Sequence, residues 1–424
     1  PEVAEQRKLY IKAMVGTVVL TLIVLWACIP VYFGSLAHQR SYSDRLPVWF
    51  VDLDGGDIGN AMRTAVQANI NTKTQAKLGW IIKDASKFGS EADIANDVVE
   101  ERAWAALVVS PNATSKLITA RQNGDARYNP STALVFMYNQ ARNELATNTY
   151  IVPFTQGLIS AAAANFSASY AARYLASQSG NATALAALIA APQTITTPIS
   201  YTQDNLRPYT AAVASALTLV GSIYIIIFAF VITLSGYVMR QALEPYLKTK
   251  DLLLLRVLAP LLLYVPVSFS YAMVALCFKV PFNAKYTRAG GFFVFWLYTY
   301  MGMAALGLAT EAMITLLTER FMSYFLIPLI ICNVAVAALP IVLEPWFYRY
   351  GYGIPVYNMG QATRTIIFNT KSHLGLNAGV LIAWIALSCF TIPLFTLLVR
   401  RRARAAEATF IPPQKHEMFD GDQQ

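Results

Sequence analysis

The chain has 424 residues, of which 56% are hydrophobic and only 13% are charged, whereas soluble domains carry roughly 25% charged residues. The net charge is +9, but its densest basic cluster, Arg400, Arg401, Arg402 and Arg404, directly follows an apolar run. A cluster in that place is typical of a membrane flank facing lipid headgroups. The composition therefore argues against an ordinary soluble protein, and we expect no nucleic-acid partner.

Residues that commonly carry catalysis or bind metals are sparse. All four cysteines lie inside apolar runs, and the three histidines are scattered along the chain. Neither a disulfide framework nor a zinc site is expected from that distribution. No Ser-His-Asp, Cys-His or metal-spaced cluster is visible, so we predict a protein that is not an enzyme and that has no metal or cofactor.

Six apolar segments are each long enough to cross a bilayer core, which takes about 20 residues of helix. Helices buried in a soluble protein rarely run so long with so few charges, so we predict an α-helical polytopic membrane protein with one span followed by five. The first span is interpreted as an uncleaved signal anchor, because it is long and lacks a clear cleavage site. The predicted spans are 13–38, 208–239, 257–278, 289–312, 321–343 and 374–399.

Basic residues near the ends of these spans orient them. Twelve Lys and Arg lie near ends assigned to the cytosol, and six lie on the opposite short loops. Cytosolic loops are the ones enriched in these residues. We therefore expect a cytosolic N-terminal flank at 1–12, a cytosolic basic tail at 400–424, and the large segment 39–207 outside the cytosol. Three N-glycosylation sequons, at Asn112, Asn165 and Asn181, fall in that outside segment.

The segment 39–207 alternates strand and helix patterns, which is typical of an α/β layer domain. Ser90 and Asp93 form a predicted capping box at one helix start. An Ala-rich helical run, broken only near Pro153, is too polar to span and is expected to form a stalk or a cap over the second span. The predicted strands are Pro47–Leu53, Leu78–Ile82, Trp104–Val109, Ala133–Tyr138 and, more weakly, Thr194–Thr202. The predicted helices are Ile58–Ile70, Glu91–Arg102, Thr114–Arg121, Gln140–Ser177 and Asn181–Ala190.

A turn with two carboxylates follows the first predicted strand, at Asp52, Asp54, Gly55 and Gly56. Paired carboxylates can perform acid–base chemistry or bind a cation. Asp at a strand-to-helix turn is more often a helix cap, and we favour the cap.

Glu311 is the sharpest candidate for function within the spans, because an ionisable group at membrane depth is costly and points to function. The alternative is that it lies at the membrane interface and pairs with Arg320 or Arg256.

Three further span residues could line a transport path. Pro260 and Pro266 interrupt the third predicted span, and Asn333 lies in the fifth. Broken helices line such paths in transporters. Tolerated kinks, and a hydrogen bond from Asn333 to a neighbouring helix, explain the same residues equally well.

The segment 344–373 is rich in aromatic residues, which are typical of the membrane–water interface. It is predicted to be an extracellular aromatic loop or a re-entrant hairpin, and a specific ligand site is the alternative. Its candidate residues are Glu344, Trp346, Arg349, Tyr352, Tyr357 and Arg364.

Four stretches resemble a known group of membrane proteins. LPVWFVDLDGGDIGNAM (Leu46–Met62), WAALVVSPNATSKL (Trp104–Leu117) and MYNQARN (Met137–Asn143) are similar to elements of proteins related to type-2 ABC-transporter permeases, including bacterial phage-infection-protein-like relatives. EPWFYRYGYGIPVYN (Glu344–Asn358) resembles the aromatic segment of fungal nitrosoguanidine-resistance membrane proteins. The resemblance implies a plasma-membrane protein linked to drug or mutagen resistance and to lipid homeostasis. It also implies a homodimer.

One feature departs from true ABC transporters, because the sequence has no G-x-x-x-x-G-K-[ST] motif and only short predicted cytosolic loops. The leading hypothesis is therefore a permease-like protein without its own ATPase that moves or binds lipid-like or drug substrates. The alternative is a cell-surface scaffold or receptor whose outer domain binds a protein or wall partner. Membrane lipids and a separate protein are the expected partners.

Overall fold

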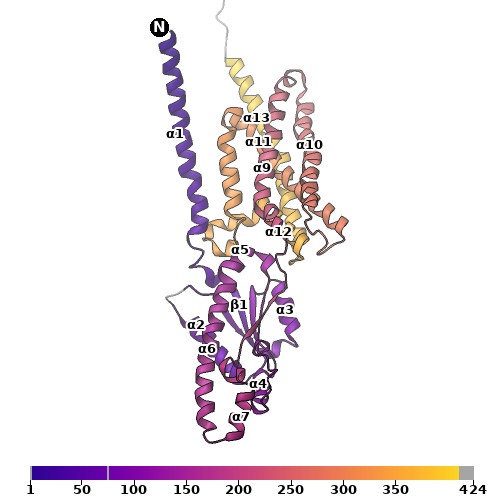
Figure 1. Cartoon of the computed structure of the whole chain (residues 1–424). Coiled ribbons are helices and arrows are strands. Elements are labelled where there is room, and N and C mark those ends of the chain that lie inside the picture. The colour runs from indigo at the N-terminus through magenta and orange to yellow at the C-terminus, as the bar shows by residue number, and fades with distance from the viewer. Residues whose placement is uncertain (1, 74–75, 410–424) are drawn as a thin grey trace, which may run out of the picture.

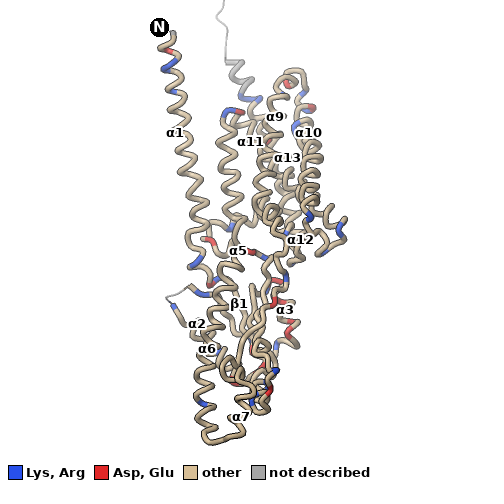
Figure 2. The backbone as a smooth tube through the Cα atoms, in the orientation of Figure 1, with Lys and Arg blue, Asp and Glu red and all other residues tan. Residues whose placement is uncertain are grey.

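The computed structural model describes residues 2–73 and 76–409 (Figure 1). Figure 1 shows an elongated molecule with a bundle of long helices at one end and a layered α/β domain at the other. The start of the first helix and the C-terminal end of the last described helix lie at the end of the bundle far from the α/β domain. The middle of the bundle is almost free of charged residues (Figure 2).

Within the described residues, five helices are long and apolar enough to cross a membrane, judged by length and composition. Their outward faces carry Leu, Ile, Val and Phe, which suits contact with lipid tails. The first of them stands apart, since none of its most apolar window is buried. The five are α1 (Glu2–Ala37), α9 (Gly221–Gln241) with the turns that precede it, α10 (Thr249–Cys277), α11 (Arg288–Ala335) and α13 (Leu374–Thr409).

The fourth predicted span falls within α11, which is interrupted at Thr318 by a non-helical backbone (φ 61°, ψ 168°). The fifth predicted span, 321–343, falls within α11 only as far as Ala335, and its remaining residues follow the end of the helix. The stretches 305–309 and 325–333 line one cavity, so the two parts of α11 lie side by side and the chain reverses near Thr318. The part after Thr318 is about 25 Å long at 1.5 Å per residue, slightly less than a bilayer core. Six membrane crossings therefore stay a prediction.

Pro260 and Pro266 do not break the third predicted span, as the alternative of tolerated prolines expects. Both lie inside α10, which runs without interruption from Thr249 to Cys277. Proline in a helix removes one backbone hydrogen bond, but neighbouring groups can compensate within a bundle. Pro260 is buried, whereas Pro266 faces outward.

The α/β domain is built on a five-stranded sheet with the order β2-β1-β3-β4-β5. The first three strands are parallel, with Val48 paired to both Trp80 and Ala105. β4 runs antiparallel to β3, and β5 runs parallel to β4. The strands are β1 (Pro47–Asp52), β2 (Gly79–Lys83), β3 (Ala105–Val109), β4 (Leu134–Tyr138) and β5 (Tyr201–Asn205).

Apolar side chains alternate between the two faces of the central strands, as the two-residue period of a strand requires. Val48 and Phe50 point to a core formed with α2 (Asp57–Asn71), α4 (Ala113–Gln122) and α6 (Val152–Ser177). Trp49 and Val51 point to the opposite core, which α3 (Glu91–Val99) covers. Ser90 caps α3 by accepting a hydrogen bond from the Asp93 amide.

Two expectations for the end of this segment are wrong. Thr194–Thr202 is not one strand, because α8 (Gln193–Thr196) occupies its start and β5 begins at Tyr201. The Ala-rich helices do not cap the second span. α6 instead packs on α2 over the sheet, and α7 (Ala182–Ala190) lies at the end of the molecule farthest from the bundle (Figure 1).

The α/β domain and the bundle are joined by apolar as well as polar contacts. Leu339 and Leu343, which follow α11, belong to the same core as β1 and α6. Arg45 donates from Nη1 to the Glu344 carbonyl oxygen at 3.1 Å. After a 3-10 helix at Trp346–Gly353, the short helix α12 (Pro355–Phe368) is buried at the base of the bundle against α11 and α13. The aromatic segment therefore enters the bundle without crossing it.

Candidate functional site

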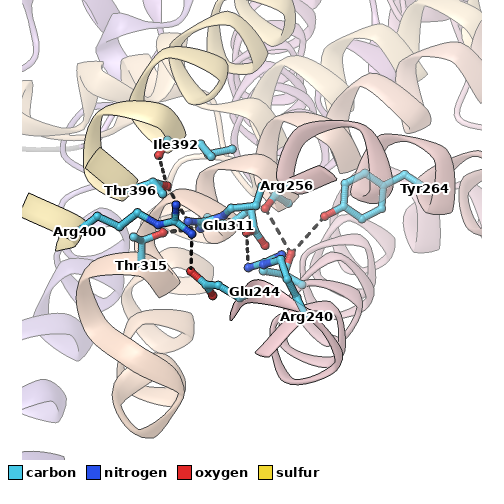
Figure 3. A network of polar contacts seen from close by, with 11 residues as sticks. Arg240, Glu244, Arg256, Tyr264, Glu311, Thr315, Ile392, Thr396 and Arg400 are labelled. Atoms are coloured by element: carbon cyan, nitrogen blue, oxygen red, sulfur yellow. Dashed lines mark hydrogen bonds and ion pairs between the residues drawn. The ribbon is translucent and has the colours of Figure 1, made fainter. Parts of the chain in front are cut away.

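A cluster of charged side chains is buried in the bundle where α9, α10 and α11 meet (Figure 3). Glu311 comes from the middle of α11, Arg240 from the last turn of α9 and Arg256 from the first half of α10. Their exposed fractions are 1%, 7% and 5%. All three positions interrupt otherwise apolar helix faces, so the helices carry these charges into a dry environment.

Both guanidinium groups bind the same carboxylate oxygen. Arg240 Nη2 lies 2.7 Å and Arg256 Nε 2.8 Å from Glu311 Oε1. Arg256 also donates from Nη2 to the Glu311 carbonyl oxygen at 2.9 Å and to the Thr315 hydroxyl. Its Nη1 reaches Thr396 Oγ1 on α13 at 2.7 Å. Arg256 thus ties three helices together through one side chain.

The network extends to the surface at the end of the bundle away from the sheet. Arg400 on α13 lies 3.7 Å from Glu244 and donates to Thr249 at 2.7 Å. In the described part of the chain, the network of Figure 3 holds three arginines and two glutamates. The network therefore carries a net charge of +1, because Arg240 and Arg256 share one carboxylate.

A cavity of about 200 Å³ opens between α9 and α10 next to this cluster. Its walls are mainly apolar, and Arg240, Glu311 and Thr233 are among its few polar lining residues. Pro260 lines it as well. The arrangement places positive charge and hydrogen-bond donors beside an apolar cavity.

The sequence identified part of this cluster. Of the two arginines considered as partners for Glu311, Arg256 is in contact with it, and Arg320 lies elsewhere, lining a cavity between α1 and α11. Arg240 is one of the twelve basic residues near the cytosolic ends of the spans, and the sequence alone does not single it out as a partner of Glu311. The sequence feature that could have identified Arg240 is its position in the last turn of a span, from which its side chain can still reach the interior of the bundle.

Asn333, the other polar candidate in the spans, holds two helices together. Its Nδ2 donates to the Leu329 carbonyl oxygen at 2.8 Å, and its Oδ1 accepts from the Val356 amide at 3.3 Å. It is 2% exposed. Asn333 therefore accepts a hydrogen bond from the first turn of α12, as the structural alternative expects, and it also lines the cavity between the two parts of α11.

The carboxylates after β1 accept backbone hydrogen bonds. Asp52 Oδ1 accepts from the amides of Asp54 and Gly55, at 3.1 and 3.0 Å. Asp54 Oδ1 accepts from the Thr114 amide at 3.0 Å, at the start of α4. Gly55 adopts φ 66°, the left-handed region that favours glycine, and a Cβ on Gly56 would lie 2.6 Å from the Thr114 hydroxyl. These contacts are those of a structural turn.

The residues of the aromatic segment separate into three groups. Arg364 is buried and pairs with Glu144 of the α/β domain, and it also donates to the Ala141 carbonyl oxygen at 3.1 Å. Glu344 is buried without a side-chain partner among the described residues. Trp346 and Arg349 are exposed, whereas Tyr352 and Tyr357 pack edge to face, with ring centroids 5.6 Å apart.

The three sequon asparagines are exposed on the α/β domain. Asn112 precedes α4, Asn165 lies on α6, and Asn181 caps α7 through its side chain. Among residues 2–73 and 76–409, no group of three His, Cys, Asp or Glu side chains could hold a metal ion.

Comparison with known proteins shows the family. A family model described as a protein of unknown function, DUF3533, matches residues 17–390. An uncharacterized endoplasmic reticulum membrane protein of Saccharomyces cerevisiae is 25% identical over 425 residues, which cover 93% of this chain and 81% of the yeast protein. No solved structure matches the chain. The chain is thus a membrane protein with apolar helices of spanning length, and it belongs to the DUF3533 family.

Proposed function

We propose that this chain is a permease-like protein, without its own ATPase, that binds and moves a lipid-like amphiphile with an anionic head. The observation that carries the proposal is the excess positive charge of the buried Arg240–Glu311–Arg256 cluster beside an apolar cavity. A role in xenobiotic resistance or membrane lipid homeostasis would follow from that activity.

The charge balance favours an anionic ligand. A buried ion without a partner costs several kcal/mol, so a cluster with one surplus guanidinium gains most from an anion that supplies the missing charge. Arginine is also the side chain best suited to bind phosphate, because its planar fork donates two parallel hydrogen bonds. A phosphate-bearing headgroup fits both requirements.

The cavity favours a ligand whose apolar part remains in the membrane. A volume of about 200 Å³ is below the roughly 300–1,000 Å³ of pockets that enclose a small molecule. Its rim includes Met239, Leu243 and Leu263, which are 73%, 53% and 51% exposed on the outside of the bundle. A headgroup can therefore reach Arg240 from the side while the acyl chains lie along α9 and α10.

The yeast relative is named as a protein of the endoplasmic reticulum membrane. That membrane is accordingly the first in which to look for this chain, ahead of the plasma membrane that the resemblance implies. The proposed orientation places both termini in the cytosol and the α/β domain on the other side.

A cavity-filling variant gives the sharpest test. Gly236 lines the cavity and has open space where a Cβ would point, so Gly236→Trp can occupy the cavity beside Arg240 without replacing any residue of the charged cluster. Gly379→Trp on α13 is the matched control, because Gly379 also has open space but lies outside the cavity. The full chain is reconstituted in vesicles, and transbilayer movement of a fluorescent phosphatidylserine is followed by quenching.

We expect Gly236→Trp to slow lipid movement about tenfold and Gly379→Trp to leave it unchanged. Equal rates in both variants, or rates equal to empty vesicles for the native chain, would overturn the proposal. Glu311→Gln adds a second surplus charge and should shift the preference toward doubly charged phosphatidic acid. A scaffold whose outer domain binds a protein partner predicts no lipid effect from any of these variants.

A further inference from the structure

A second, larger cavity lies where the α/β domain meets the bundle, at the opposite end of the bundle from the charged cluster. Its volume is about 400 Å³. The α/β domain contributes Glu101, Trp104 and Arg142, and the bundle side contributes Tyr352, Tyr357 and Asn377. Because neither part of the molecule forms it alone, the cavity depends on the fixed docking of the domain on the bundle.

Arg142 is the main charged group of the cavity. Its guanidinium stacks on the Trp104 ring, 3.7 Å from the centroid, and Nη1 donates to the Ala103 carbonyl oxygen at 3.1 Å. The Glu101 carboxylate is 3.9 Å away, beyond hydrogen-bonding distance. Burial lowers the pKa of Arg142, and Glu101 only partly opposes this effect. Several guanidinium N–H groups therefore remain available at a partly desolvated position.

The two other polar groups also present donors. Asn377, in the first turn of α13, is 1% exposed, and its Nδ2 has no hydrogen-bond acceptor anywhere in the described residues. A buried donor without an acceptor costs about 1–3 kcal/mol, so this amide gains from a ligand oxygen. His373 Nε2 lies 3.4 Å from Glu101 Oε2 and adds positive charge when the ring is protonated.

Glu101 supplies the acidic group of the cavity. Glu101 adopts φ 63°, the left-handed region, which is uncommon for a residue other than glycine. Its carboxylate stays between Arg142 and His373, so the cavity already holds one negative charge.

We propose that this cavity binds an amphiphilic anion, meaning one phosphate or carboxylate group attached to an aromatic or apolar body. Arg142, His373 and the Asn377 amide would bind the anionic group, and Trp104, Tyr352 and Tyr357 would contact the body. A volume of about 400 Å³ falls within the range of pockets that enclose small ligands. The inference does not rest on the proposed transport activity, because the two cavities share no lining residue.

The test measures binding to the full chain in nanodiscs of zwitterionic lipid. Naphthyl phosphate is the probe, and naphthol and inorganic phosphate lack its charge and its apolar body, respectively. Asn377→Leu keeps the size of the side chain but removes the donor. Gly375→Leu is the control, since Gly375 lies on the same helix turn with open space around its Cβ position and does not line the cavity.

By isothermal titration, we expect naphthyl phosphate to bind more tightly than either fragment, and Asn377→Leu to weaken it about fivefold to tenfold. The melting temperature of Asn377→Leu should stay equal or rise, because the substitution removes an unsatisfied amide; a purely structural Asn377 would lower it. Unchanged affinity in Asn377→Leu, or naphthol binding as tightly as naphthyl phosphate, would refute the site.

A further arm distinguishes two sources of the same chemistry. Phosphatidic acid incorporated in the nanodisc should compete with the probe if the natural ligand is a lipid headgroup. Absence of competition, with the probe still bound in the native chain, assigns a soluble amphiphile entering from the aqueous side. Either result supports the site.

Discussion

Replacing Glu344 with Gln should make the stability of the protein less dependent on pH. Glu344 is 2% exposed, and neither carboxylate oxygen has a partner among the described residues. The nearby Arg45 guanidinium binds the backbone carbonyl oxygen of Glu344. Burial raises the pKa of this carboxyl from an ordinary 4.5 to about 8. At neutral pH the folded protein therefore holds a proton that the unfolded chain releases.

The direction of the effect follows from proton linkage. Between about pH 4.5 and 8 the folded state binds one more proton than the unfolded state, so the free energy of unfolding decreases as pH rises. At about 1.4 kcal/mol per pH unit, the loss over that window has an upper limit of about 5 kcal/mol. Water penetration at the buried site reduces this, and we expect about 3 kcal/mol. Glu344→Gln cannot ionise and escapes the loss.

The assay is thermal unfolding in detergent micelles, followed by tryptophan fluorescence from pH 5 to 8.5. At pH 5 the native chain and Glu344→Gln should melt at similar temperatures, since both carry a neutral buried group. The variant should become progressively more stable than the native chain up to about pH 8. Glu5→Gln, at the exposed start of α1, is the control. A constant offset between Glu344→Gln and the native chain at every pH would refute the reasoning.

Three further predictions concern the topology and the packing. If the α/β domain faces the lumen or the exterior, glycosidase treatment should change the mobility of the chain, and each Asn→Gln substitution at a used sequon should remove part of that change. The sequon residues are Asn112, Asn165 and Asn181. Arg364→Leu leaves Glu144 without its buried partner and should lower the free energy of unfolding by about 3 kcal/mol. The double variant Arg364→Leu/Glu144→Leu should lose less, and a double-mutant cycle of unfolding measures the difference. Gly307→Ala should cost about 1–3 kcal/mol of unfolding free energy, because its Cβ would overlap the Tyr264 hydroxyl, whereas Gly379→Ala should cost much less.

Much of the α/β domain could be predicted from the sequence because its central strands carry their own signals. β1 and β3 are continuous apolar runs bounded by turn residues, and the structure places them within one residue of expectation. β5 could not be found in the same way. Its residues Tyr201–Asn205 are mostly polar and partly exposed, since it is an edge strand that pairs only with β4. Its place in the sheet depends on tertiary contact rather than on local pattern.

The candidate site was predictable only in part, for a related reason. A single glutamate inside an apolar run is visible from sequence, so Glu311 could be identified directly. Its partners lie 71 and 55 residues away on other helices, and no spacing rule connects them. The same limit applies to Asn377 and Arg142, which meet only because the domain docks on the bundle. Whether a polar residue serves a helix, a partner or a ligand is decided by that packing.

The apolar joint at Leu339 and Leu343 determines how the α/β domain can be studied in isolation. A fragment ending at Arg207 would contain all five strands but would have two cavities in its core, at the positions that Leu339 and Leu343 fill in the full chain. Deleting a buried leucine typically costs about 2–5 kcal/mol. Such a fragment should be poorly soluble, because its core is incomplete. Fusing the peptide 336–345 to the fragment, or adding it separately, should fill the cavities and restore solubility.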